Sequence, residues 1–407
     1  MKTTFKITFA ASMLAVVLGG CNQPEPPPTK VKEDATDLPL RNADDTLRAR
    51  FTVGDTTFDR VFLPADGLGP NYIRSSCSGC HGKAVKGPGV VQKMALVDAD
   101  GFTPAADQSA LQYGHTVRPY FEGGATVPLM PPTNSHLKLS LRVGIAVVGR
   151  GYMEAVSDDE ILRVEAEQAA RGDEIHGQVN RVVFHSQPNT DSRFPTHQLN
   201  DANLIGRFGL KARNVSLDDF AADASQGDMS ITSPMRPTEL ANPSNAVDDF
   251  KAGIDADLAF INELADYMRL IEIPRRETPD DHAVALFATA KCAACHVPTL
   301  HTRADYPFAP LANIDAPIYT DLLIHDMGAA LADGIVDESA GPRQWRTAPL
   351  IGLRHFRSFM HDGRAKSVAE AITAHGAADS EARGSAAAFS SLSPADQAAL
   401  IAFVESL

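Results

Sequence analysis

Apolar residues recur at helical spacing in several long stretches of this chain, and they alternate as in a strand in very few. In 247–272 the apolar residues recur every three or four positions, which predicts one amphipathic helix over the whole stretch. These residues are Leu258, Ile261, Leu264 and Met268. The stretch 157–171 is also predicted to be helical, whereas strand-like runs are limited to VPLM at 127–130 and RVVF at 181–184. The pattern predicts a mainly α fold with minor β structure.

Two helices in the last third of the chain carry clear start signals. The stretch DDHAVALFATAK (280–291) begins with acidic residues and continues with apolar residues at helical spacing. The stretch SPADQAALIAFVESL begins with Ser393 as N-cap and Pro394 in its first turn. The run PRRETP (274–279) reads as a linker. We therefore expect two domains, a longer one with many loops over 51–274 and a smaller helical one over 275–407.

The chain contains a short internal repeat. The segments FGLKARNVSLDDFAADA (208–224) and FMHDGRAKSVAEAITAH (359–375) align without gaps and share Phe, Arg and Ser at the same places. The shared residues Ser216 and Ser367 are each followed three positions later by an acidic residue, as in a capping box. Both copies are therefore predicted to begin a helix after an Arg-containing loop, which favours a duplicated domain.

The N-terminus resembles an export signal. Residues 1–20 combine two lysines with an apolar run that ends in small residues, which is typical of a signal peptide. Cys21 follows directly, as in a bacterial lipobox, where the thiol is lipidated and becomes the mature N-terminus; a plain secretory signal is the alternative. Residues 21–50 are rich in Pro and charge and read as a flexible tether. The expected location is the periplasm, with a lipid anchor in a membrane surface.

Composition and charge exclude some classes of function but do not identify one. A chain of 407 residues with 44% hydrophobic and 22% charged residues has ordinary globular composition, long enough for two domains. The formal charge of −14 argues against a nucleic-acid partner, for which a basic footprint is expected.

The other cysteines form two identical patterns, CSGCH at 77–81 and CAACH at 292–296. In an exported protein they could form two disulfides, redox dithiols or half-sites for zinc. The His after each second Cys favours another use: thiols one helical turn apart form thioether bonds to a haem, and the next residue is an axial iron ligand. We therefore predict two covalently bound haem c groups. The attaching residues are Cys77, Cys80, Cys292 and Cys295, and the proximal ligands are His81 and His296.

Six ordered stretches give this chain a family resemblance. They are GLGPNYIRSSCSGCHG, LIGRFGLKARNVSLDDF, GDMSITSPM, YTDLLIHDMGAALADG, QWRTAPLIGL and FMHDGRAKSVAEAITAH. They resemble the di-haem oxidoreductase family of peroxidase type, which is more distantly similar to bacterial di-haem cytochrome c peroxidases. The resemblance runs from about residue 55 to 407. It implies two cytochrome c-like haem domains, one with a reactive haem and one with a haem that relays electrons from a donor protein, and peroxide as a substrate.

The resemblance also assigns roles to single residues. Trp345 is implied as an electron relay between the haems, with a buried structural aromatic as the alternative. The related peroxidases carry a Gln and then a Glu–Met pair beside the reactive haem, whereas this chain has Phe220 and Asp228–Met229 there. Loss of the Gln argues against peroxide chemistry, while Asp228 keeps a carboxylate for proton transfer. His375 stands where the family has the distal ligand of the second haem; a buried core His is the alternative.

The remaining candidates rest on local context. Met130, before two prolines, resembles the distal Met of small cytochromes c and is a candidate sixth ligand of the first haem, with a loop Met packed in the core as the alternative. His115 and His136 are rival ligands. Arg346 and Arg364 could pair with haem propionates or be surface charges. Two further histidines, His325 and His361, precede Asp and are predicted to brace loops by hydrogen bonds.

Two functions from different classes fit these observations. The first is a di-haem oxidoreductase of peroxidase type. Peroxide reduction takes two electrons and each haem iron readily stores one, so the duplication would have a physical reason. The second is a pure electron-transfer cytochrome in which both irons are saturated by protein ligands. A third, less favoured function is an accessory haem protein of a membrane redox complex.

Overall fold

The computed structural model describes residues 36–246, 251–276 and 278–407. The predicted signal peptide, Cys21 and the first part of the tether lie outside these residues. In the described ranges, no helix has both the length and the apolar character of a membrane span.

The described part of the chain is 32% helical when short 3-10 turns are included, and 14% of it lies in strands and isolated β-bridges. Its helices are α1 (Asp45–Asp59), α2 (Arg150–Ala155), α3 (Asp158–Ala169), α4 (Leu217–Met229), α5 (Leu258–Leu270), α6 (Asp281–Thr289), α7 (Val368–Ala374), α8 (Arg383–Ser391) and α9 (Pro394–Ser406). The strands form antiparallel pairs: β1 (Asn71–Tyr72) with β3 (Tyr120–Phe121), β2 (Val90–Leu96) with β4 (Leu137–Val143), β5 (Arg181–Val182) with β6 (Leu204–Ile205), β7 (Leu300–His301) with β8 (Asp315–Ala316), and β9 (Ile324–Asp326) with β10 (Gln344–Arg346). The prediction of a mainly α class with minor β structure is confirmed.

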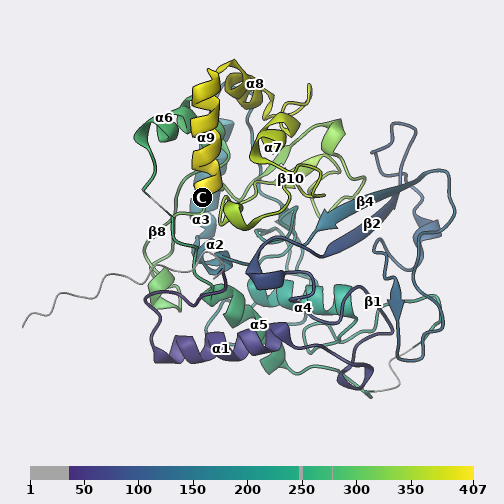
Figure 1. Cartoon of the computed structure of the whole chain (residues 1–407). Helices are drawn as coiled ribbons and strands as arrows, with labels where there is room; N and C mark the ends of the chain where they lie inside the picture. Colours follow the sequence, from purple (N-terminus) through teal and green to yellow (C-terminus); the bar gives the residue numbers. More distant parts are fainter. Residues whose placement is uncertain (1–35, 247–250, 277) are drawn as a thin grey trace, which may run out of the picture. The chain divides into compact units, whose positions relative to one another are not determined.

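Two helix pairs organise the two ends of the described chain (Figure 1). Helix α1 packs against α5, and helix α6 packs against α9. Aromatic rings make both contacts: Phe51 and Phe58 of α1 lie against Tyr267 of α5, and Phe287 of α6 lies against Phe403 of α9. In each pair, the first helix precedes one of the Cys-containing pentapeptides in the chain.

The pairing of β2 with β4 was not predicted. Seven residues of each strand pair in antiparallel register, from Val90 opposite Val143 to Leu96 opposite Leu137. Neither strand alternates apolar and polar residues cleanly: Leu139 and Leu141 are exposed, whereas Met94 and Leu96 are buried. The strand signal is therefore weak in the sequence, and the pairing depends on a partner more than forty residues away.

The prediction of one helix over 247–272 is wrong for residues 251–257, and residues 247–250 lie outside the described part of the chain. Helix α5 begins only at Leu258, with Asp257 as N-cap accepting a hydrogen bond from the Phe260 N–H. Just before it, the buried carboxylate of Asp255 accepts hydrogen bonds from both the backbone N–H and the hydroxyl of Thr232. These tertiary bonds hold the preceding segment in a non-helical path. The other predicted helices agree with α3, α6 and α9 within two residues.

The internal repeat has the same backbone in both copies. Phe208 bridges Asn214 in the first copy, and Phe359 bridges Ala365 at the equivalent positions of the second. Positive φ angles also recur in register, at Gly209 and Ala212 in one copy and at Met360 and Gly363 in the other. Ser216 and Ser367 then cap α4 and α7, each accepting from the backbone N–H three residues later. The predicted loop and helix are therefore present twice.

Two apolar clusters of the described residues bear on the domain boundary, a large one and a smaller C-terminal one. The smaller cluster is built from α6, α7, α8 and α9. The larger cluster includes α1, α4 and α5, and it also takes buried residues from 300–323, such as Leu311 and Leu323. The segment 300–323 therefore packs with elements from before the predicted boundary at 274/275, although it follows that boundary in the chain.

Candidate functional site

Both pentapeptides fold as a single helical turn. The backbone N–H of His81 donates to the carbonyl of Cys77 at 3.0 Å, and that of His296 donates to the carbonyl of Cys292 at 2.9 Å. A second bond closes each turn between the two cysteines of the pair. The thiols of a pair are thus one turn apart, as attachment of a haem requires.

The imidazoles that follow are oriented alike. Nδ1 of His81 lies 2.6 Å from the carbonyl oxygen of Ile145, and Nδ1 of His296 lies 3.2 Å from that of Tyr319. Because a carbonyl only accepts, Nδ1 carries the proton and Nε2 presents its lone pair, as in metal-ligating histidines. Burial lowers the pKa of His81, and burial together with the nearby His375 lowers that of His296 to about 4. Both rings are therefore neutral at pH 7, the form that binds iron.

The four thiols are free and are not poised for redox chemistry. Burial raises the pKa of Cys77 to about 12 and those of Cys80 and Cys292 to about 11. Reactive dithiols need the opposite shift, because the thiolate is the nucleophile. The dithiol alternative is therefore disfavoured by the surroundings of these residues.

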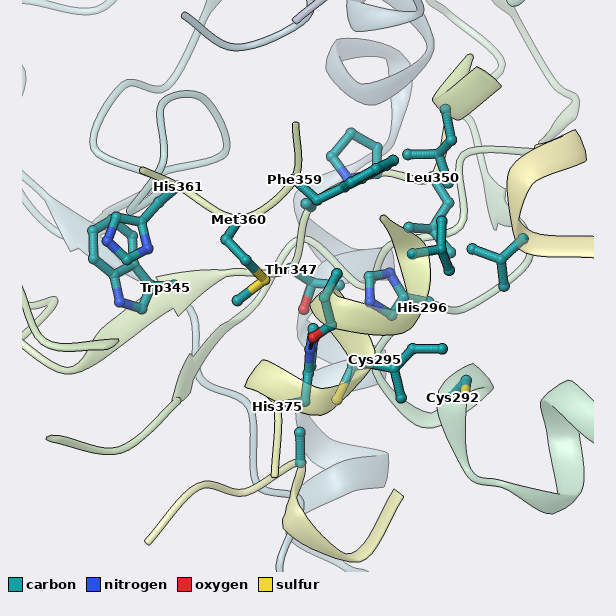
Figure 2. A pocket seen from close by; sticks show the side chains of 18 of the residues that line it. Cys292, Cys295, His296, Trp345, Thr347, Leu350, Phe359, Met360, His361 and His375 are labelled. Atoms are coloured by element: carbon teal, nitrogen blue, oxygen red, sulfur yellow. Dashed lines mark hydrogen bonds between the residues drawn. The ribbon is translucent and has the colours of Figure 1, made fainter. Parts of the chain in front are cut away.

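An apolar cavity adjoins the second pentapeptide (Figure 2). Cys292, Cys295 and His296 line one part of it. Another part is lined by Val368, Ala371 and Ile372 of α7 and by His375, which directly follows this helix. Nδ1 of His375 lies 2.6 Å from the carbonyl oxygen of Ala371, so its Nε2 is free as well. A cavity with an attachment turn and two neutral imidazoles fits a haem with two axial histidines.

His325 also lines this cavity but is engaged on both nitrogens. Its Nδ1 lies 2.7 Å from a carboxylate oxygen of Glu381, and its Nε2 lies 2.9 Å from one of Asp321. The pKa of His325 is raised well above its usual value, by the charges of Cys295 and Asp321 against an opposing effect of burial. Asp321, His325 and Cys295 lie close enough to hold a metal ion, but both imidazole nitrogens have carboxylate partners. The ring braces its loop, as predicted.

Trp345 lies in a stack at the edge of the same cavity. Its indole is parallel to the imidazole of His361, with ring centroids 3.8 Å apart and planes at 13°. Its Nε1–H donates to the carbonyl of Leu331 at 3.0 Å. Two buried cations lie over the indole: Nζ of Lys211 is 4.4 Å and the guanidinium carbon of Arg142 is 5.5 Å from the ring centroid. The predicted relay residue is therefore in the cavity wall, within a charged environment.

Asp228 lies at the first pentapeptide. Its backbone carbonyl accepts from the Ile73 N–H at 2.7 Å, and its charge helps raise the pKa values of Cys77 and Cys80. Burial raises the pKa of Asp228 itself, opposed by the charge of Lys93. Lys93 has a pKa lowered to about 8 by burial and donates to the hydroxyl of Thr116. The first site therefore contains a buried carboxyl group whose pKa lies above that of an ordinary aspartate.

The two predicted arginines differ. Arg346 is buried and lines the cavity, donating from Nε to the carbonyl of Gly209 and from Nη1 to that of Thr347. Arg364 has an exposed side chain, paired with Asp362 at 2.6 Å, and does not line the cavity. The structure brings Arg346 to the site and leaves Arg364 on the surface.

The candidates for the sixth ligand of the first haem lie at the surface. Met130 is 53% exposed. His115 and His136 are exposed and donate from Nδ1 to the carbonyls of Met94 and Val97, respectively. Their role as ligands stays a prediction.

One segment forms a wall common to both sites. The carbonyl of Ile145 accepts from His81, and Ile145 also lines the cavity of the second pentapeptide, together with Ala146 and Val148. Gly144 packs against the first site, since a Cβ there would lie 2.9 Å from the carbonyl oxygen of Cys80. One loop therefore contacts the sites of both pentapeptides, which are 215 positions apart in the chain.

Sequence reasoning missed several cavity residues. Met360 lines the cavity in the left-handed conformation, at the position where the first copy of the repeat has Gly209. A Met at a position that favours Gly is a signal visible in the alignment of the two copies. Arg150 in the cavity wall and Lys211 over the indole of Trp345 gave no such signal, because nothing in the sequence distinguishes a buried cation from a surface one.

Comparisons with known proteins identify the family of this chain. The model of the family described as "Di-haem oxidoreductase, putative peroxidase" matches residues 133–407. No curated protein matches the sequence. Among solved structures, the diheme peroxidase BthA of Burkholderia thailandensis is similar at 15% identity and a TM-score of 0.32, over 85% of this chain and 74% of that one. Hydrazine synthase of Kuenenia stuttgartiensis is similar at 10% identity and a TM-score of 0.38, over 98% and 100%. With a family match over most of the chain, this protein belongs to the di-haem oxidoreductase family.

Proposed function

We propose that this protein is an exported peroxidase that holds two haem c groups in two cytochrome c-like units. The haems are attached by thioether bonds at Cys77 and Cys80 and at Cys292 and Cys295. Support comes from the equal helical turns of the two pentapeptides and from the equal orientation of His81 and His296. The pairing of α1 with α5 and of α6 with α9 gives each unit a helix before its pentapeptide and a partner helix after it.

The assignment of one reactive haem and one electron-relay haem rests on a difference between the two copies of the repeat. His375 directly follows α7, and the residue at the same position of the first copy is Ala224 in α4. The second haem therefore has an imidazole available on each face, whereas α4 offers a methyl group to the first. A saturated iron suits electron relay, and an iron with one open face suits substrate binding. The first haem is the reactive one in this proposal.

Asp228 has the proton-handling role at the reactive haem. A bound haem would supply a site for peroxide and, together with the second haem, the two electrons that reduction of peroxide to two waters takes. Asp228, whose pKa is raised by burial, would donate one of the two protons needed; solvent would supply the other and reprotonate Asp228. The neighbouring cations Lys93 and Arg213 attract negative charge to the same place.

Electrons enter from a donor protein and pass through the second haem. The shared wall at Ile145 and the stack of Trp345 with His361 are the routes between the sites. Arg346 is placed to pair with a propionate of the second haem. In this proposal Met130 is a ligand of the first haem only in a resting state. Its exposed side chain can then move away from the iron.

The location proposed is the bacterial periplasm, with Cys21 lipidated and the Pro-rich residues directly after it acting as a tether. The predicted tether of 21–50 is too long, because Leu40 is buried in the core and α1 begins at Asp45. The layout of residues 1–21 supports this proposal. A lipid anchor at a membrane surface would keep the protein near membrane-bound electron donors.

The test uses purified holoprotein. Pyridine haemochrome assay and mass spectrometry count covalent haems, EPR separates high-spin from low-spin iron, and peroxide turnover is measured with a reduced cytochrome donor. We expect two covalent haems, of which at least one becomes high-spin and peroxide-reactive after partial reduction.

Two variants locate the chemistry. Asp228→Asn should lower peroxide turnover by about 10²–10⁴-fold without changing the haem spectra. The control is Asp219→Asn, a buried carboxylate of the same helix that bonds Ser186 and Asn214 and should leave turnover nearly unchanged. Two low-spin haems in every redox state with no turnover would favour the pure electron-transfer cytochrome instead.

A further inference from the structure

Arg150 is a buried cation in the wall that the two sites share. It begins α2, is 4% exposed and lines the cavity of the second pentapeptide. Its Nε and Nη2 donate to the carbonyl of Ala146, and its Nη1 contacts the sulfur of Met153. Within the described residues no carboxylate lies within ion-pair distance of Arg150. The second N–H groups of Nη1 and Nη2 form a fork without a protein partner there.

Arg346 is a second cation of the same kind in the same cavity. It is 6% exposed, donates only to backbone carbonyls and has no ion-pair partner among the residues described. Burial lowers the pKa of Arg346 to about 10, and burial together with the charge of Arg346 lowers that of Arg150. The two guanidinium groups therefore repel one another in an apolar cavity.

This arrangement is costly unless an anion completes it. An unpaired charge taken out of water costs several kcal/mol even after relaxation, and arginine does not escape by losing its proton. Three other buried arginines of the described chain pair with carboxylates: Arg269 with Glu154, Arg142 with Asp333 and Arg207 with Asp158. Arg118 donates to the carbonyl of Gly227 instead. The charges of Arg150 and Arg346 therefore favour a ligand with carboxylate groups, and the propionates of a haem are such groups.

Arg150 also lies beside the first site. The carbonyl of Ala146 that it binds is next in the chain to that of Ile145, which accepts from Nδ1 of His81 at 2.6 Å. Arg346 donates instead to the carbonyls of Gly209 and Thr347, which lie outside this segment.

We infer that Arg150 is a cation shared by the two haem sites: it binds a propionate of the haem at Cys292 and Cys295, and its charge favours the reduced iron of the haem at Cys77 and Cys80. The inference rests on the proposed function. A positive charge near an iron stabilises the less positive oxidation state by Coulomb attraction. Arg150 therefore couples the reduction potentials of both haems, whereas Arg346 acts on the cavity haem alone.

The test is redox potentiometry of holoprotein variants, with the cavity haem identified as the one whose spectrum changes in His375→Ala. Arg150→Met should shift the reduction equilibrium of both haems toward the oxidised form by tenfold or more, which is about 59 mV for one electron. Arg346→Met should shift only the cavity haem. Arg354→Met is the control, since Arg354 is exposed and bonds only the carbonyl of Arg275; it should shift neither.

Arg150→Lys keeps a cation and loses the fork, so it should retain the potential of the first haem and loosen the propionate contact. A resonance Raman propionate band that shifts in Arg150→Met and Arg150→Lys would support that contact. If Arg150→Met loads haem poorly, Arg150→Lys and Arg150→Gln are compared instead. Two bound haems with unshifted potentials, or a shift confined to one haem in Arg150→Met, would overturn the inference. Wild-type protein without covalent haem would overturn the proposed function itself.

Discussion

The indole of Trp345 and the imidazole of His361 are stacked, with centroids 3.8 Å apart and planes at 13°. The stack joins the cavity to the β4 strand, because the carbonyl of His361 accepts from the Val143 N–H at 2.8 Å. Lys211 lies over the indole, and a cation there makes removal of an electron from the ring harder. Oxidised Trp345 would therefore be a short-lived species during electron transfer between the haems.

Trp345→Phe keeps an aromatic ring but raises the energy of an oxidised side chain. If Trp345 relays electrons, we expect Trp345→Phe to slow electron equilibration between the haems by on the order of tenfold, a barrier increase of about 1.4 kcal/mol. Stopped-flow absorbance after partial reduction measures this rate. Trp345→Tyr serves as the matched control, because tyrosine is again oxidisable. A purely structural role would leave Phe at least as good as Tyr.

His375→Ala removes one of the two imidazoles that face the cavity. The iron there should lose an axial ligand and become high-spin, which low-temperature EPR and the visible spectrum detect. His325→Gln is the control, since both nitrogens of His325 are held by carboxylates and the ring is not free to bind iron. A low-spin spectrum that persists in His375→Ala would show that another residue is the ligand.

His361 should make stability depend on pH. Burial lowers its pKa in the folded protein to about 4, below the value of about 6.5 in an unfolded chain. Its contribution is therefore fully present above pH 6.5 and is lost as the pH falls towards 4. Between pH 7 and pH 5 this residue should account for about 2 kcal/mol of the loss in unfolding free energy.

The variant His361→Phe keeps a ring against Trp345 and removes the titrating group. Urea unfolding at pH 7 and at pH 5 should show a smaller drop in the variant than in the wild type. An equal drop in both proteins would mean that His361 is not a source of the pH dependence.

The buried ion pair of Arg269 with Glu154 should be a major element of stability. Nε of Arg269 lies 2.6 Å from Glu154, and the Tyr306 hydroxyl donates to the same carboxylate. Arg269→Met leaves that carboxylate buried without its cation, so we expect a loss of about 3–5 kcal/mol in unfolding free energy. Arg163→Met breaks pairs with Glu160 and Glu167 at the surface and should cost less than about 1 kcal/mol. Denaturant unfolding of both variants checks the difference.

The sequence by itself determined the features that depend on neighbouring residues. The turns of both pentapeptides, the caps Ser216, Ser367 and Ser393, and the helices α3, α6 and α9 follow from local spacing and hydrogen bonding. The internal repeat was also visible, because both copies keep the same loop and cap residues. Family membership follows from ordered motifs of the same local kind.

Only the tertiary structure decided where distant segments meet. The first turn of α5 is set by bonds between Asp255 and Thr232, and the pairing of β2 with β4 by a partner far along the chain. The burial of Arg150 and Arg346 without carboxylates, and the loop at Ile145 that contacts both sites, also depend on long-range packing. A residue's charge and shape are written in the sequence, but its desolvation and its partners exist only once the chain has folded.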